Sequence, residues 1–564
     1  MERQRPDTTT HEIELYIRTY YSLLRSTGEV RVRSFEEAHS YSDSSLHPGA
    51  LLGELDPGAF GYAAKRLPAV MRDTSLVVLG QSEEQFSAFG YEVDGWSRVQ
   101  SPGRRRPMRW NGSDALAMFI ASASDIDDLI PIVTAYQIEW NKLHERLRGL
   151  DLSTLEKTPT VDQLATWLGG SQEEAVLLER ALEPEVLPTL HAVASRKLDL
   201  RVRLLAGSFT QYQRVADRWW RGVEPLYLEP SARPAPIYFV SSNTHSLANL
   251  LGGYALAHAD QIRQTLEARG DIELTKDLEL SAEKDDEVAQ ANLLYFALRE
   301  HVRHVASAKA SVQAWDVESG IRTVPDPDHV EVTAQVIRMS ALRPERFDPR
   351  LEMEGLEWLV DSEAIIVNID YPLGMAAYQL LSRVCRGTSE LRGVYVMGKA
   401  ATLNARVGDV MISGVVHDEH SKNTYIFRNA FDAGEVGVHL RYGSVLDNQK
   451  ALTVRSAFLQ NRDYMGVFYR EGYTVLEMEA GPYLSAVYES VDPRRHPQDE
   501  IVVLGDRVPY ELGILHYASD TPYSRRQELL SKSLGYFGMD ATYACAAATL
   551  RRVLSRELSM MGRG

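Results

Sequence analysis

Apolar residues recur at helical spacing through the first part of the chain. They do so over about residues 10–35 and 160–220, and most regularly after Ser124, which stands where a helix N-cap would. The positions that follow predict one long amphipathic helix: Ile126, Leu129, Ile130, Val133, Trp140, Leu143 and Leu147. One apolar run, at 76–79, predicts a buried strand. We therefore expect residues 1–230 to form a mainly helical region.

Beyond residue 236, short apolar runs alternate with polar turns and helical stretches. The runs lie at 237–240, 364–369, 394–397, 409–412, 474–477 and 513–518, and a last helix is expected at about 540–558. Runs without alternation are typical of strands buried on both faces, and their alternation with helices indicates a parallel sheet covered on both sides. The pattern predicts an α/β fold whose C-terminal domain has a central mixed, mainly parallel sheet.

The length of 564 residues exceeds what one core supports, so two or three domains are expected. Residues 231–236 have linker composition, and a strand, a polar turn and a helix follow them. We predict three parts, namely the mainly helical region 1–230, a connecting region 231–345 and an α/β domain 346–564.

Composition narrows the classes of partner. Hydrophobic residues make up 44% and charged residues 25% of the chain, which is ordinary for a globular protein. The net charge of −17 argues against binding to nucleic acid, because a phosphate backbone requires a basic face. The densest basic cluster, 104–106 with Arg109, stands beside Pro102 and Pro107 and is interpreted as a solvated loop.

Cysteine usage and hydropathy indicate a compartment. Cys385 and Cys545 lie in apolar, helical contexts without a partner at metal-ligand spacing, so we expect buried thiols in a reducing environment. No apolar run approaches the length of a membrane span, and the first residues lack an apolar signal core. A cytoplasmic protein with no membrane partner is predicted.

Acidic residues follow two of the predicted strands. Glu477 and Glu479 flank Met478 at the end of one strand, and Ser519 and Asp520 end the other. Open α/β sheets bind ligands at the carboxyl ends of their strands. Two such ends in one domain predict a site that holds a polyhydroxylated ligand and delivers a proton to it.

Four segments in this order resemble the nucleoside phosphorylase and nucleosidase superfamily, which includes purine nucleoside phosphorylases. They are 398–403 followed by 408–412, then 443–446, 477–480 and 519–520, and the resemblance covers about 363–555. The resemblance implies cleavage of the N-glycosidic bond between a ribose and a base, usually a purine. It also implies a small-molecule nucleoside or nucleotide ligand and a homo-oligomer.

The resemblance assigns roles to individual residues. Glu479 would accept hydrogen bonds from the ribose hydroxyls, Met478 would pack under the sugar, and Asp520, beside Ser519, would protonate the purine. Phe458 stands about where the family places an aromatic residue on the base. The residue types suit the reaction, because an anion stabilises an oxocarbenium-like sugar and an acid stabilises the departing base.

Other interpretations of these residues stay open from the sequence. Asp520 by itself has the setting of a helix cap, and Met478 and Phe458 have the character of core residues. Glu477 would either bind the ligand or pair with a Lys or Arg side chain.

The chain departs from the phosphorylase pattern at the turns that would bind phosphate. Neither 370–375 nor 397–400 contains an arginine, and Lys399, after Gly398, replaces a small residue at an expected helix N-terminus. Lys399 would bind inorganic phosphate or a nucleotide's own phosphate, or lie on the surface. Arg455 is the best arginine candidate for a phosphate.

Missing arginines favour water as the nucleophile, so the leading hypothesis is a nucleosidase that hydrolyses a purine nucleoside or an AMP- or ATP-like nucleotide. The alternatives are a phosphate-dependent phosphorylase and a catalytically silent nucleotide-binding sensor or assembly protein. No cofactor is expected. The cluster 417–420 (His-Asp-Glu-His) is interpreted as a surface or substrate-contacting loop rather than a metal site.

Overall fold

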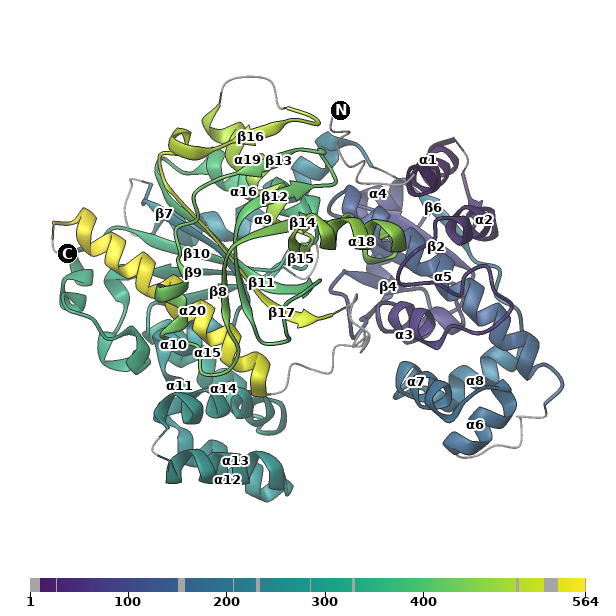
Figure 1. Ribbon diagram of the computed structural model, residues 1–564, viewed down its shortest axis with the longest axis horizontal. Coiled ribbons are helices and arrows are strands. Elements are labelled where there is room, and N and C mark those ends of the chain that lie inside the picture. Colours follow the sequence, from purple (N-terminus) through teal and green to yellow (C-terminus); the bar gives the residue numbers. More distant parts are fainter. Residues whose placement is uncertain are drawn as a thin grey trace.

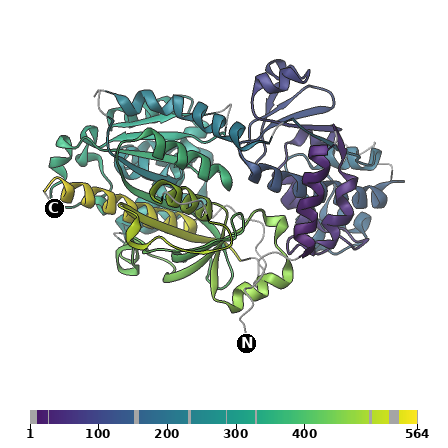
Figure 2. The ribbon, with the colours of Figure 1, turned by 90° about the horizontal axis from the view of Figure 1, so that it is seen from above.

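The computed structural model consists of two lobes that lie side by side (Figures 1 and 2). It describes residues 11–26, 28–150, 158–205, 207–229, 234–284, 286–326, 330–492, 497–521 and 536–562. The small lobe contains the first helices and strands of the chain, and the large lobe contains the C-terminal half. Part of the expected linker, 231–233, falls outside the described residues.

The small lobe is mainly helical, as predicted, but its helices surround a six-stranded sheet where the sequence predicted one strand. The longest of these helices, α5, begins at Ala123 with Ser122 at its N-cap instead of Ser124. The sheet order is β1 (Val30–Arg31), β6 (Arg201–Leu204), β2 (Leu76–Gly80), β5 (Ala115–Phe119), β4 (Met108–Trp110) and β3 (Ser97–Val99). The helices are α1 (His11–Ser26), α2 (Arg33–Tyr41), α3 (Pro57–Lys65), α4 (Glu83–Ala88), α5 (Ala123–Leu147), α6 (Val161–Leu168), α7 (Gln172–Leu182) and α8 (Val186–Ser195).

The large lobe is built on an 11-stranded mixed sheet, which confirms the predicted α/β fold. Parallel pairs join β7 to β10 and β11, β11 to β17, and β14 to β12 and β15. The strands are β7 (Ile237–Ser242), β8 (Ile321–Val324), β9 (Ala334–Arg338), β10 (Ile365–Asp370), β11 (Leu391–Thr402), β12 (Val410–Asp418), β13 (Thr424–Ile426), β14 (Val445–Thr453), β15 (Tyr473–Glu477), β16 (Ile501–Val503) and β17 (Glu511–Asp520).

The boundary predicted at residue 346 divides this sheet and does not separate domains. β7 lies between β10 and β11, with Ile237 opposite both Ile365 and Leu391. β8 and β9, also from the expected connecting region, extend the sheet beyond β10. Tertiary pairing thus unites strands that more than a hundred residues separate along the chain.

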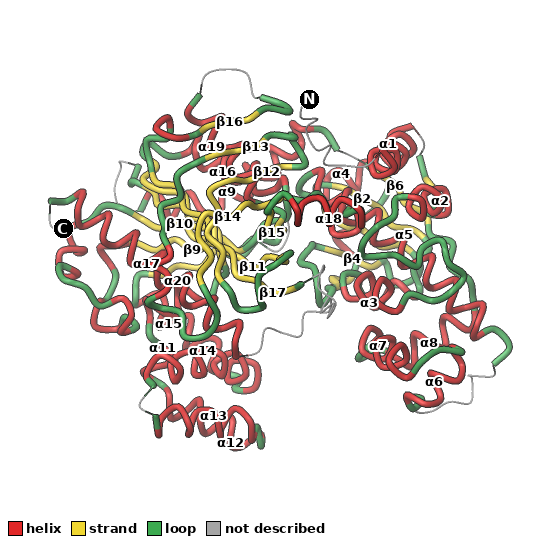
Figure 3. The backbone as a smooth tube through the Cα atoms, viewed as in Figure 1, coloured by secondary structure: helices red, strands yellow, loops and turns green. Residues whose placement is uncertain are grey.

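Helices cover both faces of the large sheet, as the alternating pattern predicted (Figure 3). One face packs against a cluster that includes residues of α10, α14 and α20, and the other against a cluster with residues of α9, α16 and α19. The helices of this lobe are α9 (Phe209–Leu228), α10 (Ser246–Gly252), α11 (Tyr254–Ala257), α12 (Ala259–Arg269), α13 (Ile272–Glu283), α14 (Glu287–His304), α15 (Ala308–Glu318), α16 (Met375–Gly387), α17 (Ala433–Gly437), α18 (Arg462–Arg470), α19 (Ala480–Val491) and α20 (Tyr536–Met560). Among the described residues, none of the helices has the length and apolar character to cross a membrane.

A segment of the large lobe is inserted into the core of the small lobe. Phe458 and Leu459, between β14 and α18, belong to the apolar cluster of the small lobe. The neighbouring backbone pairs there as well: the Ser45 amide donates to the Gln460 carbonyl at 2.6 Å, and Asn461 Nδ2 donates to the Ser42 carbonyl at 3.2 Å. The two lobes are therefore joined through a shared core.

Replacing Phe458 by Ala is expected to lower the free energy of unfolding by about 3–5 kcal/mol, because a fully buried ring leaves a cavity between the lobes. Denaturant unfolding followed by fluorescence measures the change. Exposed Tyr469 on α18, changed to Ala, serves as the control and should cost much less. Equal stability of the Phe458 and Tyr469 variants would contradict the shared core.

Candidate active site

The strand ends that carry the predicted carboxylates meet on either side of β11. Ala401 of β11 pairs with Asp520 at the end of β17 and, on its other edge, with Leu476 of β15. Leu476 and Asp520 are therefore two strand spacings, or about 10 Å, apart. The acids that follow β15 and the Ser519–Asp520 pair thus lie on opposite sides of the C-terminal part of β11.

Glu477 organises the turn between β15 and α19. Its buried carboxylate accepts hydrogen bonds from the backbone amides of Glu479 at 2.6 Å and Ala480 at 2.7 Å, and from the Thr453 hydroxyl. The donors to Glu477 are thus two backbone amides and a hydroxyl, where the sequence analysis favoured a Lys or Arg side chain. Glu477 thereby satisfies the first amides of α19 and directs the next carboxylate, that of Glu479, toward the pocket.

Glu479 is half-buried and faces a pocket. Its carboxylate accepts hydrogen bonds from the backbone amides of Met478, at 3.3 Å, and Gly374. Burial raises the pKa of Glu479, and the adjacent Glu477 carboxylate raises it further, while the Arg104 guanidinium acts in the opposite direction. A substantial part of the Glu479 population is thus protonated at a pH where an ordinary carboxyl group is ionised.

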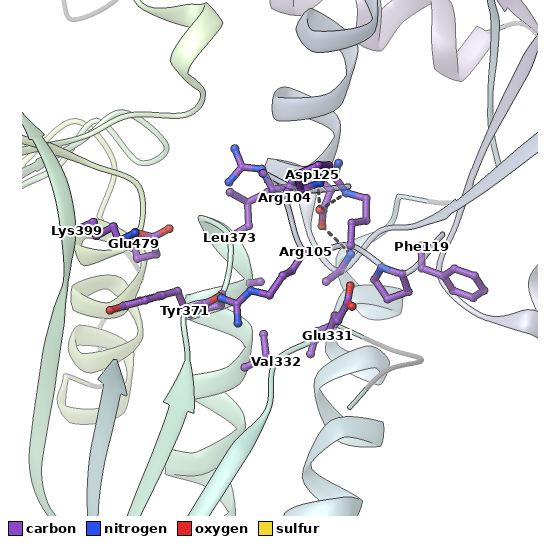
Figure 4. A pocket seen from close by; sticks show the side chains of 18 residues that line it. Arg104, Arg105, Phe119, Asp125, Glu331, Val332, Tyr371, Leu373, Lys399 and Glu479 are labelled. Carbon is purple, nitrogen blue, oxygen red and sulfur yellow. Dashed lines mark hydrogen bonds and ion pairs between the residues drawn. The ribbon is translucent and has the colours of Figure 1, made fainter. Parts of the chain in front are cut away.

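The pocket lies between the two lobes and has a volume of about 450 Å³ (Figure 4). Glu479, Lys399 and Tyr371 line it from the large lobe. The small lobe contributes the loop 102–107, which includes three arginines, and the first turn of α5. The volume lies in the range of sites for small organic ligands, which are often found at domain interfaces.

The basic loop at 104–106, interpreted from the sequence as solvated, forms one wall of this pocket. Arg106 donates to Asp125 at 3.0 Å and to Asp128 at 3.2 Å, and Arg104 donates to Asp128 at 2.7 Å. Arg105 crosses to the large lobe. The clustering of three arginines was the only sequence signal for this wall.

Asp520 and Ser519 end β17 beside Lys399. The Ser519 hydroxyl donates to Asp520 Oδ2 at 2.8 Å. Partial burial lowers the pKa of Lys399, and the negative charge of Asp520 partly offsets this effect. Lys399 lies within β11 opposite Tyr517, so the predicted helix N-terminus at this position is wrong. Residues 522–535, which follow Asp520, fall outside the described residues.

Asp520, Ser519 and Glu477 are not among the residues that line the pocket, and neither are three further predicted ligand residues. Phe458 is 0% exposed and packs edge-on to Tyr62 with ring centroids 5.3 Å apart, so neither face is available to a base. Gly398 is buried, and a Cβ there would lie 3.1 Å from the Tyr371 ring, which covers it. Met478 packs against the apolar cluster around Leu452.

Arg455, the predicted phosphate ligand, lies at the junction of the lobes and not at the pocket. Its backbone amide donates to Glu419 Oε2 at 3.0 Å and its Nε to the Glu419 carbonyl at 3.2 Å. Asp127 of α5 and Tyr20 of α1 are its electrostatic neighbours. Arg455 thus joins the lobes rather than offering its charge to a ligand.

The cluster 417–420 also contributes to the junction. Ser124 Oγ lies 3.1 Å from His420 Nε2, and His420 Nδ1 lies 2.9 Å from Asp418 Oδ1. This Ser-His-Asp chain presents no nucleophile to a ligand, because Ser124 is 0% exposed and its hydroxyl accepts from the Met375 amide at 2.9 Å. Within the described residues, no group of three or more His, Cys, Asp or Glu side chains could hold a metal ion.

Comparison with solved structures gives matches of low similarity. A putative methylthioadenosine nucleosidase from Weissella paramesenteroides is 11% identical, over 44% of this chain and 95% of that chain, with a TM-score of 0.29. An S-adenosylhomocysteine nucleosidase from Streptococcus pyogenes is 9% identical, over 57% and 97%, with a TM-score of 0.29. A uridine phosphorylase from Schistosoma mansoni is 12% identical, over 32% and 70%, with a TM-score of 0.23. At these values the likeness carries no argument about activity.

The match to a sequence family covers more of the chain than the matches to solved structures do. No curated protein matches the chain. A family model described as a family of unknown function, DUF6909, matches residues 32–555, a range that includes both lobes and the pocket between them. The chain therefore belongs to the DUF6909 family.

Proposed function

We propose that the protein is a nucleosidase that hydrolyses the N-glycosidic bond of a purine nucleoside or nucleotide. The observation that supports the proposal most is the arrangement around β11. Its residue Ala401 separates Asp520 from the strand that leads to Glu479, and Glu479 lines a pocket of about 450 Å³. Asp520 does not line this pocket, but its charge acts on Lys399, which does.

In the proposed reaction, ionised Glu479 accepts hydrogen bonds from the ribose hydroxyls and stabilises the positive charge that develops on the sugar. Asp520 protonates the departing base, so that the base does not leave as an anion. Ser519, which donates to Asp520 Oδ2, holds that carboxyl group in one orientation. Water attacks the sugar carbon from which the base departs, and the proton that this water loses restores the acid form of Asp520.

Phosphorolysis is the second candidate reaction. The turns 370–375 and 397–400 of the large lobe contain no arginine, but the small lobe places Arg104 and Arg105 in the pocket wall. Inorganic phosphate would then replace water as the nucleophile. A silent nucleotide sensor is the third candidate, and it differs from both enzymes in releasing no base.

The test is incubation of the protein with a panel of purine nucleosides and nucleotides, with and without inorganic phosphate, followed by chromatography. Release of free base together with ribose or ribose phosphate, independent of added phosphate, is the expected result. Release only in the presence of phosphate would establish the phosphorylase. Tight binding without release of any base would refute both enzymatic proposals and support the sensor.

A further inference from the structure

The pocket has a charge balance opposite to that of the whole chain. Its charged lining residues are four basic ones, Arg104, Arg105, Arg106 and Lys399, against three acidic ones, Asp125, Glu331 and Glu479. The chain as a whole carries a formal net charge of −17. A basic excess in one pocket of an acidic protein favours an anionic ligand at that place.

The four basic side chains differ in how many hydrogen bonds and ion pairs they make within the protein. Arg106 is buried between Asp125 and Asp128 and is fully engaged in holding the loop to α5. Arg104 directs one nitrogen to Asp128, but its Nε has no hydrogen-bond partner within the part of the chain that the structure describes. This Nε is buried, so Arg104 contributes positive charge to the pocket wall next to Glu479, its electrostatic neighbour.

Lys399 and Arg105 can both reach a ligand. Lys399 is exposed in the pocket, and among the described residues its ammonium group has no hydrogen bond or ion pair. Arg105 is 44% exposed at its side chain and spans the pocket to Asp370 and the Tyr371 carbonyl of the large lobe. Figure 4 shows Arg105 directed from the small lobe toward Tyr371, with Lys399 on the far side.

We propose that Arg104 and Arg105 of the small lobe and Lys399 of the large lobe form a binding site for a phosphate group. Guanidinium and ammonium donors from two directions match the several acceptor oxygens of a phosphate. The inference rests on the proposed function in one respect: the phosphate shares the pocket with the sugar that Glu479 binds. Its source is either the 5′-phosphate of a nucleotide or free inorganic phosphate.

Isothermal titration of the full chain tests the site without requiring turnover. The probes are AMP, adenosine, ribose 5-phosphate, ribose and inorganic phosphate. Each is titrated into the wild type and into the variants Lys399→Gln and Arg105→Gln. The matched control is Arg148→Gln at the opposite end of α5, where the side chain is 64% exposed and pairs with Glu145.

The expected result is that a phosphorylated probe binds at least tenfold more tightly than its phosphate-free counterpart. Each pocket variant should lose about ten- to a hundredfold in affinity for that probe, and the Arg148 variant should lose nothing. A preference for AMP or ribose 5-phosphate identifies the substrate's own phosphate as the ligand, whereas binding of inorganic phosphate alone identifies a co-substrate. Thermal unfolding of each variant confirms that the chain is folded.

Equal binding of phosphorylated and phosphate-free probes would overturn the proposal, as would wild-type affinity in both pocket variants. The phosphate site and the nucleosidase activity can fail separately. Binding of phosphate without release of any base would support the phosphate site and refute the nucleosidase. Cleavage of adenosine as efficient as that of AMP, with no effect of phosphate, would support the nucleosidase and refute the phosphate site.

Discussion

Replacing Asp520 by Asn will lower the rate of base release by about a hundred- to ten-thousand-fold, while ligand affinity changes little. The amide has nearly the same shape and still accepts the Ser519 hydrogen bond, but it cannot supply an acidic proton to the departing base. Single-turnover release of base at saturating ligand measures the chemical step, and titration of the same variant measures binding.

The matched control for this result is Asp463→Asn on α18, whose side chain is exposed. It should leave both rate and affinity unchanged. A substrate whose base leaves easily without protonation, such as a nitrophenyl riboside, should be cleaved by the Asp520 variant almost as fast as by the wild type. Unchanged release of a purine from that variant would remove Asp520 from the mechanism.

Replacing Glu479 by Gln will lower kcat/KM by about a hundred- to a thousandfold and will also change the pH profile. The proposed reaction needs Glu479 as an anion, and burial together with the Glu477 carboxylate raises the pKa of Glu479. Activity should therefore rise with pH through this raised pKa, which puts the acidic limb of the profile above the usual carboxyl range. In the Gln variant this limb should disappear.

The measurement is kcat/KM from about pH 5 to pH 9 for the wild type and the Glu479 variant, with exposed Glu471→Gln as the control. The control should reproduce the wild-type profile. An acidic limb that persists unchanged in the Glu479 variant would show that another group titrates there.

The sequence was sufficient for the central strands of the large sheet because these strands are apolar runs. It was insufficient for the small lobe, where β1, β3 and β4 have only two or three residues each and show no periodicity. β8 and β9 were missed because β9 joins the sheet by pairing with β10, and β8 by pairing with β9. A local sequence pattern predicts a helix or a strand, but it does not predict the strand with which that strand pairs.

The same distinction applies to the site. The positions of Glu479 and Asp520 at strand ends could be predicted, since Glu479 comes two residues after β15 and Asp520 ends β17. The arginine wall could not, because Arg105 meets Asp370 only after the chain has closed a loop of 265 residues. Phe458 was misassigned for a related reason, namely that the small lobe, and not a ligand, occupies the space around its ring.

Because Phe458 and Leu459 are inserted into the small lobe, the chain cannot be divided into two independent fragments between the lobes. A fragment that begins after the linker would contain every strand of the large sheet, but it would present these two apolar side chains to water and would lack one wall of its own binding site. Such a fragment should self-associate and remain inactive even if its sheet forms. Activity should return only when residues from both halves of the gene are produced together.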